Sequence, residues 1–295
     1  MRRKTKAPVI VAIIAFILLV SLIIFEVRSP VLIVTDQAFL PLYGQTRIRR
    51  ETLIASLALF RRVETVSVAD DAGYDTVQFA VAGVSSSPFC VLFPLRFAQA
   101  ARLYRESNPQ IHVVLLEGRN GEGGELSSIN SNTGDFFIYK TDTESDFFRA
   151  GLAAAALDMG KNGIIAVFLE SGIEAQAREA FLRAINSLEK PLETRFFTSF
   201  SGFPDIPGLS CVVLAGAGAE YLEQESGVPV IFLTWIDPFL VPDDVAIIVD
   251  DSPWAQAVEA VRMVTAGVGQ GQIPSKFYIL KGKNIDKGIL SNLKK

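Results

Sequence analysis

Two kinds of hydrophobic pattern alternate along this chain. Short continuous apolar runs, such as Val31–Asp36 and residues 90–95 and 111–118, lack the polar–apolar alternation of a half-exposed strand. Amphipathic or alanine-rich stretches of helical length separate these runs. Strands that are apolar on both faces are typical of parallel sheets with helices on both sides. The pattern therefore predicts an α/β fold built on parallel sheets.

The same pattern sets out the order of the elements. We expect strands at residues 31–36, 63–68, 76–81, 90–95, 111–118, 136–141, 163–171, 195–200, 211–216, 229–235, 245–251 and 277–282, and helices at residues 47–62, 97–106, 173–188 and 217–225. Two further helices carry start signals. Thr143 and Asp146 form a capping box before an alanine-rich run that ends at Gly160, and Ser252 is an N-cap before Pro253. Residues 119–134 are polar and glycine-rich, so we expect a loop there.

These units are too many for one ordinary sheet, and they divide near Thr141. A strand, a loop and a helix start the pattern again there. We predict a first lobe of residues 31–141 plus 252–295 and a second lobe of residues 142–251. Ligands of open α/β sheets bind beyond the carboxyl ends of the strands, so a site is expected in the cleft between the lobes.

Residues 8–25 differ from every later segment, because Ser21 is their only polar residue. As a helix, roughly 18 residues span about 27 Å, close to the thickness of a bilayer core. Arg2, Arg3, Lys4 and Lys6 precede the segment, which favours a cytoplasmic amino terminus. The segment is longer than usual for a cleaved signal peptide, and no A-x-A-like site follows it. We predict that residues 1–28 form a basic head and a transmembrane signal anchor in the cytoplasmic (inner) membrane, crossed once, with the rest on the periplasmic side.

Charge and chemistry exclude several classes of function. The net charge is −4 without a basic stripe, so no nucleic-acid partner is expected. Cys90 and Cys211 both begin apolar strands and are expected to be buried free thiols. His112 is the only histidine and lies within an apolar strand, which leaves neither a histidine metal site nor a Ser-His-Asp triad. We predict that the protein is not an enzyme and carries no metal or cofactor.

Six short motifs resemble, in the right order, the basic membrane protein family of type I periplasmic solute-binding proteins. They are VLIVTD, NPQIHVVLLEG, FFRAGLAAAALDMGKNGIIAVF, FFTSF, VVLAGAGAEYL and DPFLVPDDVAIIV, and the similarity that they mark extends over most of the chain from Val31. Many members of that family bind purine nucleosides and feed ABC importers. The resemblance implies a two-lobed type I periplasmic-binding-protein-like fold, a small solute with nucleosides as one possibility, and an ABC permease as partner.

The chain also departs from that family at positions that contact the ligand. The loop after the first strand reads QAFLPLYGQTR and lacks the family's Asp-x-Ser-Phe-Asn element. A binding aspartate of the family falls at Thr234, and a binding lysine falls at Asp251. Losing such groups removes hydrogen bonds to a ribose, so the resemblance does not determine which solute is bound.

The candidate ligand-binding residues follow strand ends or open the cleft side of a helix. They are Asp36, Phe39, Tyr43, Phe93, Glu117, Arg149, Phe200, Gly216, Gly218, Trp235, Asp237 and Asp251. The aromatic rings could stack on a planar solute, and the charged groups could bond it. Structural roles stay open beside these: covering an apolar edge for Phe39 and Tyr43, close packing for the glycines, a helix N-terminus for Asp251, and pairing with Asp146 for Arg149.

Two hypotheses of function remain. The first is a membrane-anchored solute-binding protein of an ABC-type importer, which holds a small solute in the interlobe cleft. The second is a degenerate binding-protein fold without ligand, which acts as an interaction or sensor protein for another envelope membrane protein. A cleft filled by side chains such as Phe39, Leu40 and Tyr43 would favour the second.

Overall fold

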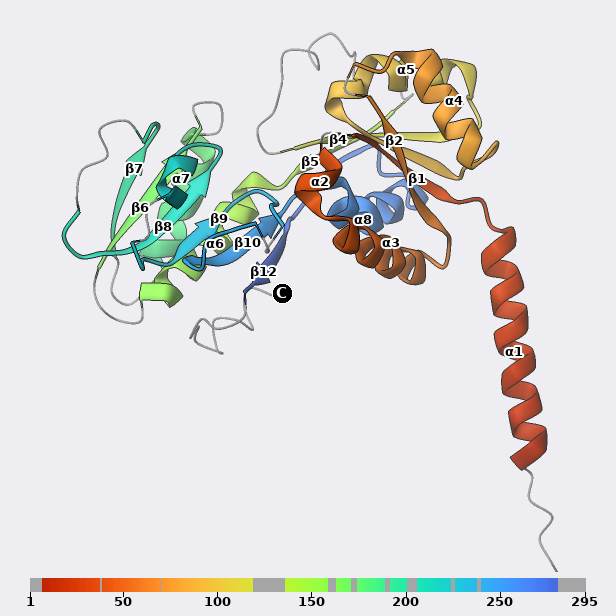
Figure 1. Cartoon of the computed structure of the whole chain (residues 1–295), viewed down its shortest axis with the longest axis horizontal. Helices are drawn as coiled ribbons and strands as arrows, with labels where there is room; N and C mark the ends of the chain where they lie inside the picture. The colour runs from red at the N-terminus through yellow and green to blue at the C-terminus, as the bar shows by residue number, and fades with distance from the viewer. Residues whose placement is uncertain are drawn as a thin grey trace, which may run out of the picture.

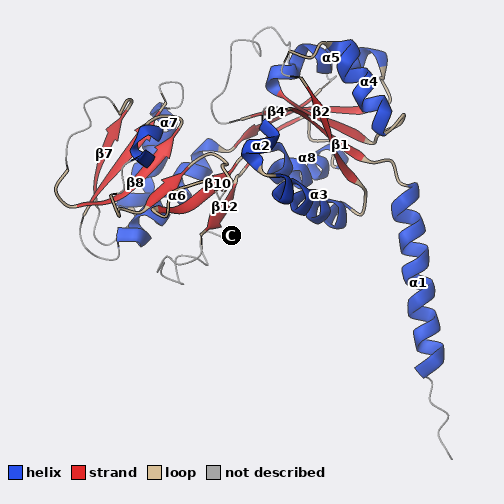
Figure 2. Cartoon of the chain, viewed as in Figure 1, coloured by secondary structure: helices blue, strands red, loops and turns tan. Residues whose placement is uncertain are grey.

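A computed structural model describes residues 7–37, 39–69, 71–118, 136–158, 163–170, 174–188, 192–200, 206–223, 226–237 and 240–280 (Figure 1). It contains two six-stranded sheets, each flanked by helices (Figure 2). Nearly all the strand ladders are parallel. The prediction of an α/β fold with parallel sheets in two lobes is therefore confirmed.

The first sheet has the order β11-β5-β4-β3-β1-β2 and only parallel ladders. Its strands, in that order, are Gln270–Ile273, Phe137–Thr141, His112–Glu117, Cys90–Pro94, Val31–Asp36 and Val63–Val68. The helices of this lobe are α2 (Phe39–Tyr43), α3 (Gln45–Leu59), α4 (Tyr74–Val84), α5 (Ala98–Ser107) and α8 (Pro253–Thr265), with the short 3-10 helix η1 (Leu95–Phe97).

Successive residues of β1 show why its apolar run is continuous. Leu32 and Val34 pack with α4 and α5 on one face, while Val31 and Ile33 pack with α3 and α8 on the other. All four side chains have no exposed surface. A parallel strand between two helical layers needs apolar residues at every position, which is the pattern in the sequence.

The second sheet has the order β12-β10-β9-β8-β6-β7. Its strands, in that order, are Lys276–Ile279, Val245–Asp250, Val230–Phe232, Leu209–Ala215, Ile164–Leu169 and Glu193–Phe197. The helices α6 (Thr143–Asp158) and α7 (Glu174–Asn186) cover one face, and the 3-10 helix η4 (Ala219–Glu223) follows β8. The apolar cluster on the other face is continuous with that around α3 and α8 of the first lobe.

The chain passes between the sheets three times. It leaves the first sheet after β5, returns after β10, and leaves again between β11 and β12, since β12 pairs antiparallel with β10. The assignment of all residues 252–295 to the first lobe is therefore wrong for β12. The third passage is held by Asp146, whose carboxylate accepts hydrogen bonds from the backbone N–H and the hydroxyl of Ser275.

Several local predictions need correction. Residues 76–81 belong to the helix α4, because Val77 and Val81 are the apolar pair that faces the sheet at helical spacing. The predicted helix at 217–225 is only the short η4. The N-cap of α6 is Asp142, whose carboxylate accepts from the Ser145 N–H, and not Thr143.

Other local predictions are confirmed or lie outside the described part. The Ser252 cap is confirmed by the hydrogen bond that its hydroxyl accepts from the Ala255 N–H. The predicted loop at 119–134 and the helix end at Gly160 lie outside the described residues.

Residues Ala7–Val27 form α1, which extends away from the first lobe in Figure 1 and touches it at its carboxyl end, where the rings of Phe25 and Phe60 meet. Within the part of the chain that the structure describes, no helix has both the length and the apolar character needed to span a membrane.

Candidate functional site

Side chains from both lobes meet where the chain crosses between the sheets. Tyr43 at the end of α2 and Arg47 and Glu51 on α3 come from the first lobe. Trp235, after β9, and Asp250, at the end of β10, come from the second lobe. We call this group, together with Ser252 and Trp254 at the start of α8 and Tyr278 on β12, the interlobe cluster. It lies at the carboxyl ends of β9 and β10, where α/β folds bind ligands.

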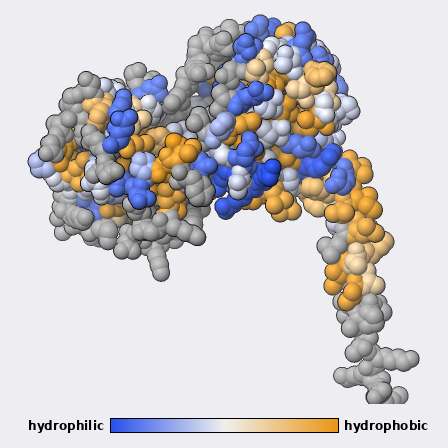
Figure 3. Space-filling model, viewed as in Figure 1, coloured by the Kyte–Doolittle hydropathy of each residue, from blue (hydrophilic) through white to orange (hydrophobic). Residues whose placement is uncertain are grey.

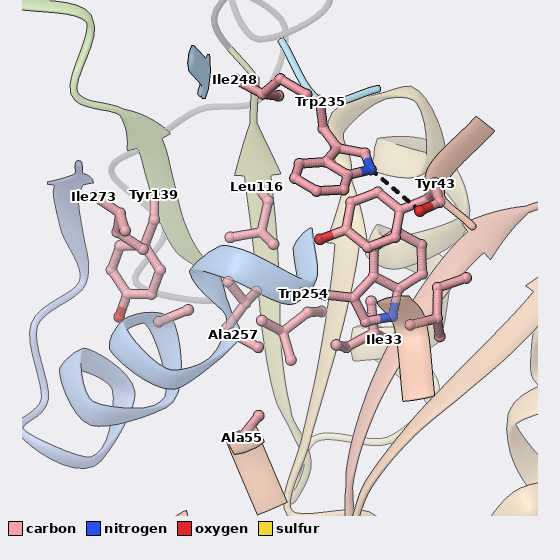
Figure 4. Packing of buried hydrophobic residues seen from close by; sticks show 14 of the residues in the cluster. Ile33, Tyr43, Ala55, Leu116, Tyr139, Trp235, Ile248, Trp254, Ala257 and Ile273 are labelled. Atoms are coloured by element: carbon pink, nitrogen blue, oxygen red, sulfur yellow. Dashed lines mark hydrogen bonds between the residues drawn. The ribbon is translucent and has the colours of Figure 1, made fainter. Parts of the chain in front are cut away.

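Tyr43 is at the centre of the interlobe cluster, with no exposed surface. Its ring centroid lies 4.4 Å from that of Trp254 and 5.1 Å from that of Trp235 (Figure 4). The Trp235 indole N–H donates to the backbone carbonyl of Tyr43 at 3.2 Å, drawn as the dashed line in Figure 4. The phenol of Tyr43 is thus enclosed by two indole rings from different lobes.

The hydroxyl of Tyr43 is satisfied in both directions. It donates to the Asp250 carboxylate at 2.8 Å and accepts from the Ser252 hydroxyl at 2.8 Å. The second oxygen of Asp250 accepts from the Ser252 backbone N–H at 3.0 Å. Burial raises the pKa of Asp250 to about 6, against the opposing effects of these hydrogen bonds and of the Arg47 charge. Burial, followed by the charge of Asp250, raises the pKa of Tyr43, so its phenol keeps its proton.

Arg47 ties the first lobe to the second by charge and by stacking. Its guanidinium lies 3.6 Å from Asp250 and 3.1 Å from Glu51. The same group lies over the rings of Trp235 and Tyr278, at 4.5 and 3.8 Å from their centroids. One cation thus contacts two aromatic rings and a carboxylate of the second lobe.

Glu51 extends the same contact toward β12. Its side chain is 3% exposed. Its carboxylate forms an ion pair with the Lys276 ammonium at 3.3 Å and accepts a hydrogen bond from the Tyr278 hydroxyl at 3.5 Å. Arg47 and Glu51 are four residues apart on α3, so they lie on one face of that helix, whereas Gly44 separates Tyr43 from it. This spacing of an arginine and a glutamate is the signal in the sequence that points to Arg47 and Glu51, neither of which is among the predicted site residues.

Some of the predicted site residues lie in the interlobe cluster, and others do not. Tyr43 and Trp235 are brought together as a site would require. At the end of β10 it is Asp250, and not Asp251, that joins the interlobe cluster. Asp237 approaches from the second lobe so closely to Gly44 that a Cβ at position 44 would overlap its carboxylate. Glycine is favoured at position 44 chiefly because φ there is +85°, a conformation that other residues rarely adopt.

Two acidic candidates lie at the carboxyl edge of the first sheet, each with a basic neighbour. Asp36 at the end of β1 is 1% exposed and forms an ion pair with Arg96 of η1. Glu117 at the end of β4 lies 2.8 Å from Lys140 on the adjacent β5. These pairs leave charged groups of both signs at the edge where the resemblance implies ligand contacts.

A second aromatic group lies at the carboxyl ends of β6 to β8. The Phe168 ring stacks on that of Phe197 at 5.3 Å and contacts that of Phe200 at 6.1 Å. The ring of Phe200 also meets that of Tyr221 on η4 at 6.4 Å. Phe200 therefore packs within the second lobe, but it lies three residues beyond β7, which ends at Phe197, and so does not end the strand as expected.

Gly216 and Gly218 make the turn between β8 and η4, with φ of +80° and +78°. A Cβ at position 218 would lie 2.5 Å from Cγ of Phe168. We expect Gly218→Ala to lower the free energy of unfolding by about 1–3 kcal/mol through this overlap, in addition to the strain of a positive φ. Gly208→Ala is the matched control, because φ there is +82° and nothing lies within 4 Å of its added Cβ. Equal losses in urea unfolding would contradict the packing role of Gly218.

Of three further candidate ligand-binding residues, two pack against other side chains and the side chain of the third lies outside the described residues. Phe93 has no exposed surface and packs in the core beside α5, with the Tyr104 ring at 6.0 Å, so its placement at the cleft is wrong. Arg149 donates to the Ser275 carbonyl at 2.9 Å and lies 4.2 Å over the Phe277 ring. Phe39 begins α2, but its side chain lies outside the described residues.

The single histidine and the two cysteines lie among packed side chains. His112 lies between the rings of Phe89 and Phe137, at 5.1 and 5.6 Å, and burial followed by the charge of Arg105 lowers its pKa. Cys90 and Cys211 are buried free thiols, as predicted. Among the described residues, no group of three histidine, cysteine or acidic side chains is placed to hold a metal ion.

The fold is shared with known proteins of low sequence identity. A transcriptional activator of the comK gene from Bacillus halodurans is 12% identical, with a TM-score of 0.57 over 90% of this chain and 95% of that one. An ABC transporter periplasmic solute-binding protein from Actinobacillus succinogenes 130z, with bound D-allose, is 12% identical. Its TM-score is 0.51 over 90% of this chain and 100% of that one.

These likenesses establish a periplasmic-binding-protein-like fold, and at such identity they establish the fold alone. The sequence matches no protein-family model and no curated protein. The resemblance to the nucleoside-binding family is therefore not confirmed.

Proposed function

We propose that this protein is a membrane-anchored extracytoplasmic receptor of the solute-binding type, which takes a small hydroxylated ring compound between its lobes. The observation that carries the proposal is the environment of Tyr43. Its ring stacks on Trp254, and its hydroxyl exchanges hydrogen bonds with Asp250 and Ser252. A nucleoside or a sugar offers the same combination of a ring face and hydroxyl groups.

Two further considerations support this class of ligand. The resemblance to the basic membrane protein family favours a purine nucleoside, and the Actinobacillus succinogenes protein of the same fold holds a sugar, D-allose. An apolar site with a few placed polar groups is typical of small-molecule binding, and Asp250 with Ser252 supplies those polar groups here. Delivery to an ABC permease in the same membrane is the transport role that we propose.

Residues 8–25 support the proposed membrane anchor. They are apolar apart from Ser21, and Arg2, Arg3, Lys4 and Lys6 precede them. The side chains of residues 7–10 and of Leu18 lie outside the described part of α1, so the support for the anchor comes from the sequence. We propose that α1 holds the lobes at the periplasmic face of the inner membrane.

A second candidate is favoured by the complete burial of Tyr43. The protein's own phenol occupies the place that a solute ring would take. In this alternative the site is permanently self-occupied, and the two-lobed fold acts as a ligand-free interaction partner of another envelope membrane protein.

The test is thermal unfolding of the full chain in detergent with purine and pyrimidine nucleosides, D-allose, other pentoses and hexoses, and amino acids. A ligand at a hundred times its Kd stabilises the folded state by about 2.7 kcal/mol, so we expect a clear rise in Tm with a nucleoside or a sugar. Asp250→Asn is the binding control and should reduce that rise. If no compound raises Tm, the solute-binding role is wrong and the self-occupied alternative is favoured.

A further inference from the structure

The outward face of α3 carries apolar side chains in water. Leu53 and Leu57 are 60% and 68% exposed and lie four residues apart on one side of the helix, and Phe60, which caps its carboxyl end, is 38% exposed. Ile54 beside them is 43% exposed. The opposite side of α3 is already packed in the core through Ile48 and Ala55. The helix therefore has a second, outward apolar stripe that the fold does not use.

This outward stripe is continuous with the end of α1. The rings of Phe60 and Phe25 meet edge to face, with their centroids 5.9 Å apart. The guanidinium of Arg28, one residue after α1, lies 5.4 Å over the Phe60 ring. In Figure 3 hydrophobic side chains run along α1, and both hydrophobic and hydrophilic side chains lie over α3. The apolar surface of α1 thus passes directly to α3.

Arginines surround the outward stripe. Arg49 and Arg50 are exposed on the first half of α3, and Arg28 is exposed beside Phe60. Arg61 follows Phe60 and donates to the Ser29 carbonyl at 3.1 Å, while burial and the charge of Arg28 lower its pKa.

Two acids lie in the same region. Arg62 is paired with Glu64 at 3.6 Å, and Glu26 on α1 is exposed. Against the single charge of Glu26, the four arginines Arg28, Arg49, Arg50 and Arg61 leave an excess of positive charge around an apolar stripe. This is the composition of a helix that lies in the interface of an anionic membrane.

We propose that the outward face of α3 lies on the bilayer that α1 enters, with anionic phospholipid as its partner. Leu53, Leu57 and Phe60 then reach the boundary of the acyl chains, and the arginines meet the headgroup phosphates. This inference rests on the proposed anchor, because α1 sets which surface α3 can reach. Such docking fixes the first lobe on the membrane and leaves the second lobe to move around the interlobe cluster.

The test uses single labels on the full chain. Cys90 and Cys211 have no exposed surface, so a thiol-reactive, environment-sensitive fluorophore reports on an introduced cysteine. Leu57→Cys probes the stripe, and Ile17→Cys probes the apolar surface of α1. Phe79→Cys on α4 is the matched exposed control, at a side chain that is 83% exposed. Each labelled protein is placed in lipid nanodiscs that contain phosphatidylglycerol, with and without brominated lipid as the quencher.

We expect brominated lipid to remove most of the fluorescence at positions 57 and 17 and to leave that at position 79 unchanged. Quenching at 17 but not at 57 overturns the docking of α3 while the anchor stands. A lack of quenching at 17 shows that the anchor itself is wrong, and the inference then fails with it. A blue-shifted label at 57 that lipid does not quench means that a protein covers the stripe, which also overturns the proposal.

A second measurement tests whether the charge of the arginines contributes to docking. Reversing both exposed arginines, in Arg49→Glu with Arg50→Glu, should weaken quenching at position 57 and leave that at position 17 as before. Replacing phosphatidylglycerol by neutral phosphatidylcholine should have the same effect. If neither change alters quenching at 57, the headgroup phosphates are not what the arginines contact, and the assignment of anionic lipid is overturned.

Discussion

Replacing Tyr43 by alanine is expected to lower the free energy of unfolding by about 3–5 kcal/mol, as for other large buried rings. The phenol has no exposed surface and lies between Trp235 and Trp254. Its removal leaves a cavity the size of a ring and takes one hydrogen bond away from Asp250 and one from Ser252. Urea unfolding, followed by tryptophan fluorescence, measures the loss directly, since both flanking residues are tryptophans.

The same cavity offers a chemical test of the proposed ligand class. p-Cresol is the side chain of tyrosine as a free molecule, so it should restore part of the stability of Tyr43→Ala and leave the parent protein unchanged. Tyr43→Phe is the matched control: it keeps the ring, loses the two hydrogen bonds of the hydroxyl, and should cost about 1–3 kcal/mol without any response to p-cresol. A Tyr43→Ala protein that is as stable as its parent would show that the ring is not held between the lobes.

The response to natural compounds then separates the two functions. If the parent protein and Tyr43→Ala both bind a nucleoside or a sugar, α2 withdraws when the solute enters. If only Tyr43→Ala binds one, Tyr43 occupies the site permanently and the interaction role is favoured. Either result turns on a single side chain, because Tyr43 makes the same contacts that a ring-bearing solute would need.

The layers of the fold could be predicted because a strand that is buried on both faces has apolar residues at consecutive positions in the sequence. Each residue of β1 faces a helical layer, so the apolar run in VLIVTD is continuous and is recognised without any knowledge of its neighbours. The segment at 76–81 was mistaken for a strand because TVQFAV alternates as well as it repeats at helical spacing. The strand β11, with the sequence QGQI, has no apolar run that predicts it, because only Ile273 is buried and the rest is held by backbone pairing with β5 at the sheet edge.

The site could be predicted only in part, because its contacts join distant residues. Tyr43 and Asp250 are 207 positions apart, and no local pattern reports their hydrogen bond. Asp250 and Asp251 are alike in sequence, and only the pleat of β10 decides which carboxylate turns toward Tyr43. The passage of the chain from β11 to β12 places Tyr278 against Arg47, and that third passage was not foreseen.

A rise in pH from 4.5 to 7.5 is expected to weaken the parent protein by about 2 kcal/mol relative to Asp250→Asn. Burial raises the pKa of Asp250 from its ordinary 3.8 to about 6 in the folded chain. The folded state therefore binds this proton more tightly than the unfolded state does. The resulting stability is complete below a pH of about 3.8 and is lost as the pH rises through about 6, about 3 kcal/mol in all.

Urea unfolding of both proteins at the two pH values isolates this effect, because every other titrating group is common to them. The asparagine side chain of the Asp250→Asn variant resembles the neutral carboxyl in shape and in hydrogen-bonding capacity, so the two proteins should be most alike at the lower pH. Asp75→Asn, at an exposed position on α4, is the control for the loss of one carboxylate. A parent protein that gains stability relative to Asp250→Asn as the pH rises would mean that Arg47, 3.6 Å away, keeps Asp250 ionised. With the proposed sign, burial of the charged Asp250 at neutral pH costs more than its hydrogen bonds and the Arg47 charge return.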